Sequence, residues 1–376
     1  MNTNAKLMDY LYSKASRKLI PLSGTFELSP VCNFSCRMCY VRKTQKEVKE
    51  SPRPILKLSD WLRIAKEARE AGMLYLLLTG GEPLLWSDFW TLYDELIDMG
   101  FLISINTNGS LIDEKAVEHF KRKPPRQINI TLYGANDDTY EKLCRAKGVF
   151  SEVNWAIRTL KEAGIVLRLN CSLTPQNVCD LDQMIQYSKE KELQMVAATY
   201  MFPPIRRDSS LIGVNERFTP EDSAKYRLKT YYLQTSEREY QEYLKKILSG
   251  YVEPPGLDEG CIDPIDGKVR CRAGKASFWI TWDGYMTPCG MMPEPKVDLV
   301  NLPFSDSWKK ITEETAQLCL SGVCDKCKNR NICNPCAAMA YAETGQSTGI
   351  PKYLCQAAVH MQKIAKETLK LDDETR

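Results

Sequence analysis

The chain carries three closely spaced cysteines in the stretch Ser29-Pro30-Val31-Cys32-Asn33-Phe34-Ser35-Cys36-Arg37-Met38-Cys39-Tyr40. Their spacing is C-x3-C-x2-C, so a single tight loop can bring all three thiols to one soft metal centre. Thiolate ligands select zinc, copper(I) or iron–sulfur sites. The stretch therefore predicts a metal-binding loop, and it follows a predicted strand.

Two kinds of metal site are compatible with this loop. A tetrahedral zinc site needs a fourth protein ligand, and the chain's two histidines, His119 and His360, are far from the loop in sequence. A [4Fe-4S] cluster held by three cysteines instead leaves one iron open to a further ligand. The sequence favours the cluster, with zinc or a group of buried thiols as the alternative.

The composition limits the remaining classes of function. A chain of 376 residues can form one large domain and a smaller one. Its formal net charge of +3 gives no electrostatic reason to expect nucleic acid or an anionic membrane as a partner. No apolar run reaches the roughly 20 residues of a membrane span, and the first residues lack the order of a signal peptide. We therefore expect a cytoplasmic protein, in which 15 cysteines indicate metal rather than disulfides.

Strand and helix patterns alternate through the first two-thirds of the chain. A strand over 24–28 enters the cysteine loop, and the unbroken apolar run 73–78 is typical of a strand buried on both faces of a parallel sheet. Four further strands are predicted over 101–105, 128–132, 165–170 and 194–198. Six strand–helix repeats predict an α/β fold, a partial (β/α)6 TIM-type barrel, with its sites at the carboxyl ends of the strands.

A second informative stretch, Gly80-Gly81-Glu82-Pro83, ends the second of these strands. Paired glycines let a backbone approach a ligand closely. Together with the upstream cysteine loop, this stretch resembles the signature motifs of radical S-adenosylmethionine (SAM) enzymes, over roughly residues 24–200. The resemblance implies that Cys32, Cys36 and Cys39 hold a catalytic [4Fe-4S] cluster. It also implies that the glycine-glycine-glutamate stretch binds the amino group of SAM, with the Glu82 carboxylate as acceptor.

The same resemblance implies further contacts to SAM. Met38 matches the position beside the adenine, and Thr131 matches a serine that bonds the ribose. Arg145 falls near the place of an arginine that pairs with the methionine carboxylate, and Arg168 is the second candidate for that role. An ordinary barrel-lining or surface position is the alternative for each.

The last third of the chain holds a second set of cysteines. Eight of the nine cysteines that follow residue 260 make up this set: Cys261, Cys271, Cys289, Cys324, Cys327, Cys333, Cys336 and Cys355. The pair Asp283-Gly284, flanked by strand-forming residues, predicts a hairpin between Cys271 and Cys289. This pattern closely resembles the SPASM domain, a C-terminal extension of radical SAM enzymes that modify peptides and proteins.

SPASM domains hold two auxiliary [4Fe-4S] clusters, and the resemblance implies the ligands of each. The cluster nearer the barrel takes Cys261, Cys271, Cys289 and Cys336. The outer cluster takes Cys324, Cys327, Cys333 and Cys355. Because the final pair is C-x2-C rather than the commoner C-x3-C, Cys333 and Cys336 are open to exchange. A double zinc site is the alternative, although zinc ribbons place about 15–20 residues between their cysteine pairs.

Four cysteines are left over: Cys144, Cys171, Cys179 and Cys319. Free cysteines are usually buried hydrophobic residues, and we expect that role here. Cys319 has the alternative roles of a spare ligand or a catalytic thiol.

These patterns divide the chain into five parts. We expect a helical lead over 1–20, the radical SAM core over 21–215, a connecting helix within 216–255, a SPASM domain over 256–360 and a helical tail over 361–376. The connecting helix, predicted as one unit over about 220–249, is rich in tyrosine. Packing against the barrel is its favoured role, and lining a peptide groove is the alternative.

The resemblance implies a radical enzyme with three [4Fe-4S] clusters and SAM as cofactors. With an electron from a flavodoxin- or ferredoxin-type donor, SAM is cleaved to a 5′-deoxyadenosyl radical that abstracts a hydrogen from a peptide or protein substrate. Formation of a thioether or another crosslink in a ribosomally made peptide is the leading hypothesis. Since Cys32 lies so close to the start of the sequence, a separate leader-binding protein is an expected partner.

Other functions stay open. Anaerobic sulfatase maturases, which form formylglycine, are of similar length, but they carry an aspartate after the cysteine that matches Cys289, where this chain has Gly290. A radical SAM enzyme acting on a small molecule is another alternative. An electron-transfer or scaffold protein without turnover is disfavoured by the intact Gly80-Gly81-Glu82-Pro83 stretch.

Overall fold

A single nine-stranded sheet, in the order β6-β5-β4-β3-β2-β1-β7-β8-β9, organises the protein. The structure is a computed structural model that describes residues 3–250 and 271–374. The strands are β1 (Ser23–Glu27), β2 (Tyr75–Thr79), β3 (Leu102–Thr107), β4 (Gln127–Thr131), β5 (Leu167–Ser172), β6 (Met195–Ala198), β7 (Ser277–Ile280), β8 (Tyr285–Thr287) and β9 (Val297–Asp298). Cys261, a predicted cluster ligand, lies outside the described residues.

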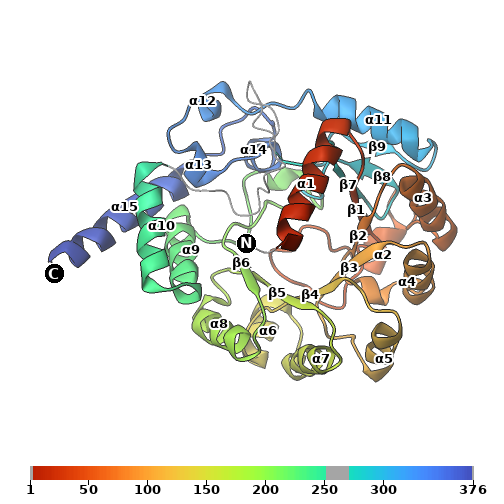
Figure 1. The fold of residues 1–376 in the computed structure, drawn as a ribbon, viewed down its shortest axis with the longest axis horizontal. Helices are drawn as coiled ribbons and strands as arrows, with labels where there is room; N and C mark the ends of the chain where they lie inside the picture. The colour runs from red at the N-terminus through yellow and green to blue at the C-terminus, as the bar shows by residue number, and fades with distance from the viewer. Residues whose placement is uncertain (1–2, 251–270, 375–376) are drawn as a thin grey trace.

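The first six strands are parallel and follow one another across the sheet in chain order. This arrangement confirms the α/β class that the alternating strand and helix patterns predict. Helices cover the outer face of the sheet (Figure 1). They are α3 (Leu58–Glu70), α4 (Phe89–Asp98), α5 (Glu114–Arg122), α6 (Asp137–Cys144), α7 (Phe150–Glu162) and α8 (Leu181–Glu190).

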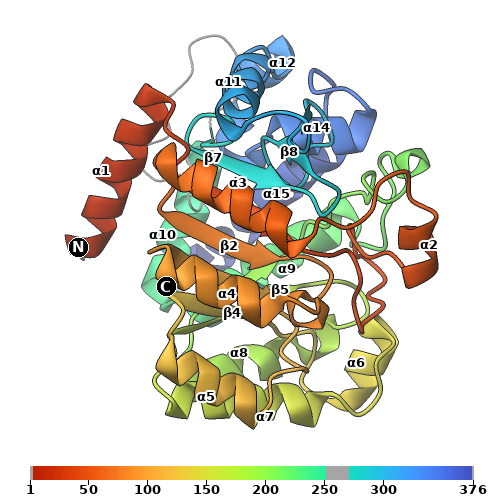
Figure 2. The ribbon, with the colours of Figure 1, turned by 90° about the vertical axis from the view of Figure 1, so that its right-hand side faces the viewer.

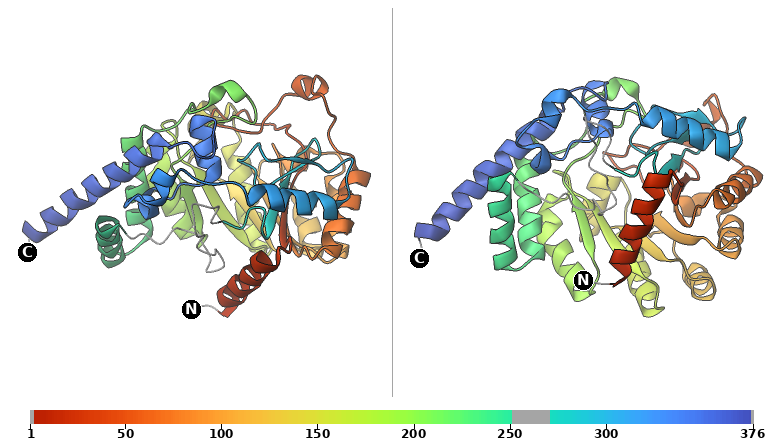
Figure 3. Two further views of the ribbon diagram at one scale, coloured as in Figure 1. Left: turned by 90° about the horizontal axis from the view of Figure 1, so that it is seen from above. Right: turned by 45° about the horizontal axis from the view of Figure 1, so that its top comes forward.

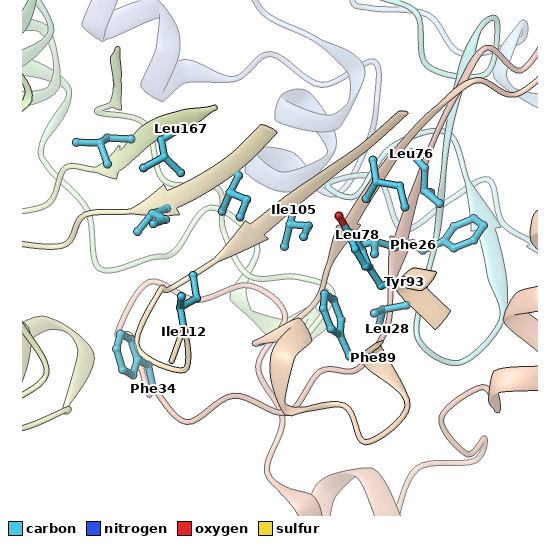
Figure 4. Packing of buried hydrophobic residues seen from close by; sticks show 14 of the residues in the cluster. Phe26, Leu28, Phe34, Leu76, Leu78, Phe89, Tyr93, Ile105, Ile112 and Leu167 are labelled. Carbon is cyan, nitrogen blue, oxygen red and sulfur yellow. The ribbon is translucent and has the colours of Figure 1, made fainter. Parts of the chain in front are cut away.

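The main core lies between the sheet and these helices. Alternate strand residues such as Phe26, Leu78 and Ile105 point outward and are fully buried against helix residues such as Phe89 (Figure 4). Each such side chain contributes about 1.5–3 kcal/mol when removed from water. The other set of alternate residues faces the inside of the barrel and is largely polar, so the lumen has room for sites.

The predicted hairpin forms, but it also extends the barrel. β7 and β8 are antiparallel, and Gly284 occupies the left-handed region (φ 87°) in the turn. On its other edge β7 pairs in parallel with β1, from Ser23 opposite Ser277. Gly24 permits this approach, because a Cβ there would come within 2.5 Å of the Phe278 ring. The cysteine-rich C-terminal region is therefore continuous with the sheet of the barrel.

The prediction of one long helix over 220–249 is wrong, because two helices occupy this region, α9 (Pro220–Gln234) and α10 (Glu237–Ser249). Ser236 begins the second helix through a capping box with Glu239, which offers the backbone a new start after Gln234. Tyr231 on α9 stacks on Tyr243 of α10, with ring centroids 4.0 Å apart. Both helices pack against α15 (Lys352–Glu374), the long helix at the end of the chain (Figure 3).

Further helices and turns complete the described structure. They are the helices α1 (Thr3–Lys18), α2 (Gln45–Lys49), α11 (Phe304–Thr315), α12 (Gly322–Asp325), α13 (Arg330–Cys333) and α14 (Ala337–Thr344), and the turns η1 (Pro83–Leu85), η2 (Val178–Asp180) and η3 (Ser209–Leu211). α1 lies on the side where the parallel strands begin, and α2 and α6 lie on the opposite side (Figure 2). Within the ranges given above, no helix has both the length and the apolar composition needed to cross a bilayer.

Candidate active site

A cavity of about 360 Å³ lies at the carboxyl ends of the parallel strands. Cys32, Cys36 and Cys39 all line it, from the loop that follows β1. Thr79, Thr107 and Thr131 end strands β2, β3 and β4 and also line it. The cavity is thus at the place where parallel α/β folds carry their sites.

Neighbouring backbone holds the cysteine loop in place. The N–H groups of Ser35 and Arg37 donate to the carbonyls of Cys144 and Leu143 at 2.8 and 3.1 Å, so the end of α6 fixes the middle of the loop. The N–H of Phe34 points at the Cys32 sulfur, at 3.3 Å. The N–H of Arg42 points at the Cys39 sulfur, also at 3.3 Å. Donors aimed at sulfur stabilise thiolates and adjust the potential of a cluster that they hold.

The [4Fe-4S] cluster expected at these three thiols stays a prediction. In the part of the chain that the structure describes, no three His, Cys, Asp or Glu side chains are close enough together to hold one metal ion. A [4Fe-4S] cluster needs instead one thiolate for each of several irons. Burial raises the pKa of Cys32 to about 12, and a thiol must lose its proton to ligate a metal.

Gly80 and Gly81 line the cavity, but their bare backbone faces the protein. A Cβ on Gly80 would come within 2.4 Å of the Ser29 carbonyl, and one on Gly81 within 2.4 Å of the Val31 carbonyl. The Gly81 N–H donates to Ser29 at 2.7 Å. These glycines therefore let the end of β2 lie directly against the entrance of the cysteine loop.

Glu82 is completely buried and is not among the residues that line the cavity. Its carboxylate accepts hydrogen bonds from the Thr107 hydroxyl and the Asn108 N–H, both at 2.8 Å, and from the Leu84 N–H at 3.2 Å. Burial raises its pKa to about 7, although these three donors lower it. The observed contacts tie the end of β2 to the end of β3, and the predicted contact to SAM stays a prediction.

The other predicted SAM contacts fall in different places. Met38 and Thr131 line the cavity with the three thiols. Arg145 is exposed at the C-terminus of α6, in the left-handed conformation (φ 54°), and is not part of the cavity wall. Arg168 lines a different cavity, at the opposite end of the barrel. The structure thus brings two of these four residues to the thiols.

Several lining residues were missed at the sequence level. Asn108 follows β3, and its side-chain amide donates to Asn33 at 2.8 Å and points at the Cys32 sulfur at 3.8 Å. Asn33 in turn donates to Ser110 at 2.8 Å. The polar stretch Asn106–Ser110 at the end of a buried strand was the available signal, because polar groups at that position face the site. Tyr133 and Phe34, both aromatic, complete this side of the wall.

The described C-terminal cysteines form two groups. Cys271, Cys289 and Cys336 share an apolar cluster with Phe202 and Met291. We call these three cysteines the inner thiol set. Burial and the neighbouring thiols Cys289 and Cys271 raise the pKa of Cys336 to about 12.

The remaining four, Cys324, Cys327, Cys333 and Cys355, form the outer thiol set. Burial, followed by the charges of Cys355, Cys327 and Cys324, raises the pKa of Cys333 to about 12. Asn334 has φ 43° and reverses the chain between Cys333 and Cys336, which explains how such close residues belong to different sets. Of the four left-over cysteines, Cys144 and Cys171 are buried, Cys319 is half-buried and Cys179 is exposed.

A buried ion pair joins the barrel to the inner thiol set. Arg206 donates through both terminal nitrogens to the Glu27 carboxylate, at 2.9 and 2.8 Å, and also to the carbonyl of Gly290 at 2.8 Å. The Trp279 indole N–H donates to the same carboxylate at 2.9 Å. Gly290 must be small, because a Cβ there would come within 2.8 Å of the Trp279 ring.

These features define a class: an α/β barrel with a thiol-lined cavity at the carboxyl ends of its strands. Comparison with known proteins gives the family. Residues 26–187 match the model of the Radical SAM superfamily, so this part of the chain is a radical SAM domain and the protein is an enzyme of that class. Membership implies SAM and one [4Fe-4S] cluster as cofactors.

Two curated relatives illustrate the range of this class. The chain is 22% identical over 336 residues to AdoMet-dependent heme synthase of Methanosarcina barkeri, covering 85% of this chain and 92% of the relative. It is 24% identical over 295 residues to the antilisterial bacteriocin subtilosin biosynthesis protein AlbA of Bacillus subtilis, covering 78% of this chain and 59% of the relative.

Solved structures share the fold. Streptococcus suis SuiB matches with a TM-score of 0.65 and 17% identity, over 92% of this chain and 80% of that chain. anSMEcpe with bound AdoMet matches with a TM-score of 0.66 and 19% identity, over 95% of this chain and 100% of that chain. At these identities the likeness concerns the fold alone.

Proposed function

We propose that this radical SAM enzyme modifies a ribosomally made peptide, by forming a thioether or another crosslink. One observation carries the proposal: both cysteine regions meet at one cavity. Phe202 and Met291 line the cavity that contains the loop thiols, and they also pack in the cluster of the inner thiol set. A substrate in the cavity would therefore contact side chains that also touch the inner set.

In this proposal Cys32, Cys36 and Cys39 hold the SAM-binding cluster. SAM held beside that cluster would supply the radical chemistry that takes hydrogen from the substrate. The chain's own residues orient SAM and exclude water. Thr131 and Asn108 offer polar groups at the strand ends, and the aromatic wall around Tyr133 keeps the cavity apolar.

The C-terminal thiols fit two further clusters. The inner set would be completed by Cys261, and the outer set supplies four thiols of its own. Thiolate-rich sites without histidine suit iron–sulfur clusters. A cluster held by the inner set would supply an electron acceptor close to the substrate, because Cys289 is two residues from Met291 in the cavity wall. A flavodoxin- or ferredoxin-type donor and a separate leader-binding protein belong to this proposal.

Peptide substrates recur among the similar proteins. SuiB has been solved with its precursor peptide SuiA, and anSMEcpe with the Cp18Cys peptide. The relative AlbA is named for bacteriocin biosynthesis. The heme synthase relative shows that a small-molecule substrate is the competing possibility.

Formylglycine formation is the other peptide reaction that must be distinguished from crosslinking. The aspartate that sulfatase maturases carry after the equivalent of Cys289 is replaced here by Gly290. The contact between that position and Trp279 leaves no room for a side chain. This favours crosslinking over formylglycine formation.

The test is a reaction of the anaerobically reconstituted protein with SAM, a reductant and a cysteine-containing precursor peptide encoded beside its gene. We expect 5′-deoxyadenosine together with a peptide that has lost two hydrogens and whose cysteine no longer reacts with an alkylating agent. Loss of sulfur from the peptide would indicate formylglycine instead. Formation of 5′-deoxyadenosine with every such peptide unchanged would overturn the peptide assignment. The Cys32→Ala enzyme and a precursor with its cysteines replaced by alanine are the controls.

A further inference from the structure

A second cavity, of about 380 Å³, lies at the opposite end of the barrel. It is lined by Met8 and Tyr12 of α1 and by residues from β1, β2, β3, β4, β5 and β7. α1 lies on the side of the molecule where the strands begin (Figure 2). Its volume is within the range of small-molecule sites, about 300–1,000 Å³.

Two arginines give this cavity a positive wall. Arg126 precedes β4, and Arg168 is the second residue of β5. The two are close enough that the charge of Arg126, after burial, lowers the pKa of Arg168. No aspartate or glutamate lies among the described residues that line the cavity.

The hydrogen-bonding capacity of the Arg168 side chain is only partly used among the described residues. Its Nε atom is buried and has no hydrogen-bond partner among the described residues. A buried donor without a partner is destabilising, and the neighbouring positive charge adds to that cost. An anion placed between the two guanidinium groups would remove both penalties.

The cavity is separate from the thiol-lined one. Asn106 lines the thiol-lined cavity and Asn129 lines the second cavity. The side-chain amide of Asn129 donates to the side-chain oxygen of Asn106 at 2.8 Å. Gln127 donates to Asn129 at 2.6 Å. These amides lie along one wall of the barrel, on the neighbouring strands β3 and β4, between the residues that line the two cavities. The two cavities share no lining residue among those described, so the arginines do not belong to the thiol-lined site described above.

We infer that this second cavity binds a small organic anion whose carboxylate or phosphate group pairs with Arg126 and Arg168. The planar guanidinium fork matches both groups in geometry. Tyr12 and Tyr75 are stacked with centroids 5.9 Å apart, and together with Trp279 they offer an aromatic wall for the body of the ligand. Cys289 lies in the same wall, so the anion would be held beside the inner thiol set. The inference does not depend on a peptide substrate.

Calorimetric titration of the anaerobic holoenzyme with inorganic phosphate and, separately, with benzoate tests the site. We expect saturable one-site binding of at least one of them, at least tenfold weaker in Arg168→Ala and in Arg126→Ala. Arg158→Ala is the matched control, since Arg158 is 56% exposed on α7, and it should bind as the wild type does. Arg168→Lys, which keeps the charge but loses the fork, should fall between.

The two probes distinguish the sources of the anion. Binding of phosphate alone assigns a phosphate ligand, and binding of benzoate alone assigns a carboxylate with an aromatic body. The inference is overturned if neither probe binds the wild type, or if Arg168→Ala and Arg158→Ala bind equally well. Iron content and circular dichroism of each variant show that a loss of binding is not a loss of fold.

Discussion

The two cysteine regions of this protein are built in different ways. The loop Cys32–Cys39 is surrounded by fixed backbone: the end of β2 lies against its entrance, and the end of α6 bonds its middle. Several C-terminal thiols instead sit on short elements, such as Cys324 on the four-residue helix α12 and Cys333 on the four-residue helix α13, although Cys355 lies on the long helix α15. The first region depends on the barrel for its shape. We expect the shape of the second region to depend more on the clusters proposed at its thiols, and this difference can be tested.

The largest expected effect comes from removing thiols in each region. Replacing Cys32, Cys36 and Cys39 by alanine should abolish SAM cleavage and leave about eight of about 12 irons, because each [4Fe-4S] cluster accounts for four. Replacing Cys324 and Cys327 should remove about four irons while SAM cleavage continues. Iron, acid-labile sulfide and 5′-deoxyadenosine are measured in parallel. Continued cleavage in the triple variant would contradict the assignment of the loop.

The second largest effect is expected from breaking the buried ion pair between Arg206 and Glu27, which joins the two regions. Arg206→Ala leaves the Glu27 carboxylate fully buried without its cation, and breaking such a pair costs about 3–5 kcal/mol of unfolding free energy. Urea unfolding under anaerobic conditions measures the loss. Arg37→Ala, which removes a half-exposed ion pair with Glu216, should cost less than about 1 kcal/mol. Equal losses for the two variants would argue against a structural role for the buried pair.

A pH dependence is expected from the first region. The pKa of Glu82 is raised to about 7 in the folded protein, against about 4.3 when unfolded. The folded state therefore binds the extra proton, and stability is lost as pH rises from about 4.3 through 7, by about 4 kcal/mol in total.

Glu82→Gln, which cannot ionise, should remove this part of the slope. Urea unfolding of wild type and variant at pH 5 and pH 8 checks it. The advantage of the wild type over the variant should be smaller at pH 8. An identical pH dependence in the two proteins would show that Glu82 does not titrate in this range.

The smallest effect compares one glycine from each region. Gly81→Ala places a methyl group within 2.4 Å of the Val31 carbonyl and should cost about 1–3 kcal/mol and displace the cysteine loop. Gly322, at the start of α12, has no atom within 4 Å of the place that a methyl group would take, and it has no positive φ. Gly322→Ala should be neutral. Thermal unfolding and SAM cleavage of both variants measure the contrast, and a harmless Gly81→Ala would refute the close packing.

Position along a strand decided which predictions matched the structure. Thr131 is the last residue of β4 and lines the thiol cavity, and its predicted bond to the ribose stays a prediction. Arg168 alternates correctly to face the lumen, but β5 begins at Leu167, so Arg168 lies at the wrong end of the barrel for that cavity. The strand predicted over 165–170 was shifted by two residues, and side-chain alternation alone does not say which end of a barrel a residue occupies.

Contacts between residues far apart in the chain could not be predicted from the sequence. The partners of Gly80 and Gly81 are about 50 residues upstream at Ser29 and Val31, so the need for glycine was visible while the reason was not. Spacing likewise left Cys333 and Cys336 open to exchange. The left-handed turn at Asn334 separates them. Asparagine can adopt a positive φ, but whether it does so depends on tertiary contacts that the local sequence does not reveal.

The pairing of β1 with β7 has a consequence for synthesis of the chain. β1 is complete after Glu27, yet its second neighbour begins at Ser277. At about 5–20 residues per second, β1 remains an open edge for roughly 13–50 s after it leaves the ribosome. An unpaired edge strand exposes backbone N–H and C=O groups that can pair with other chains. The nascent cysteine loop thus follows a strand that stays unprotected until most of the protein has been made.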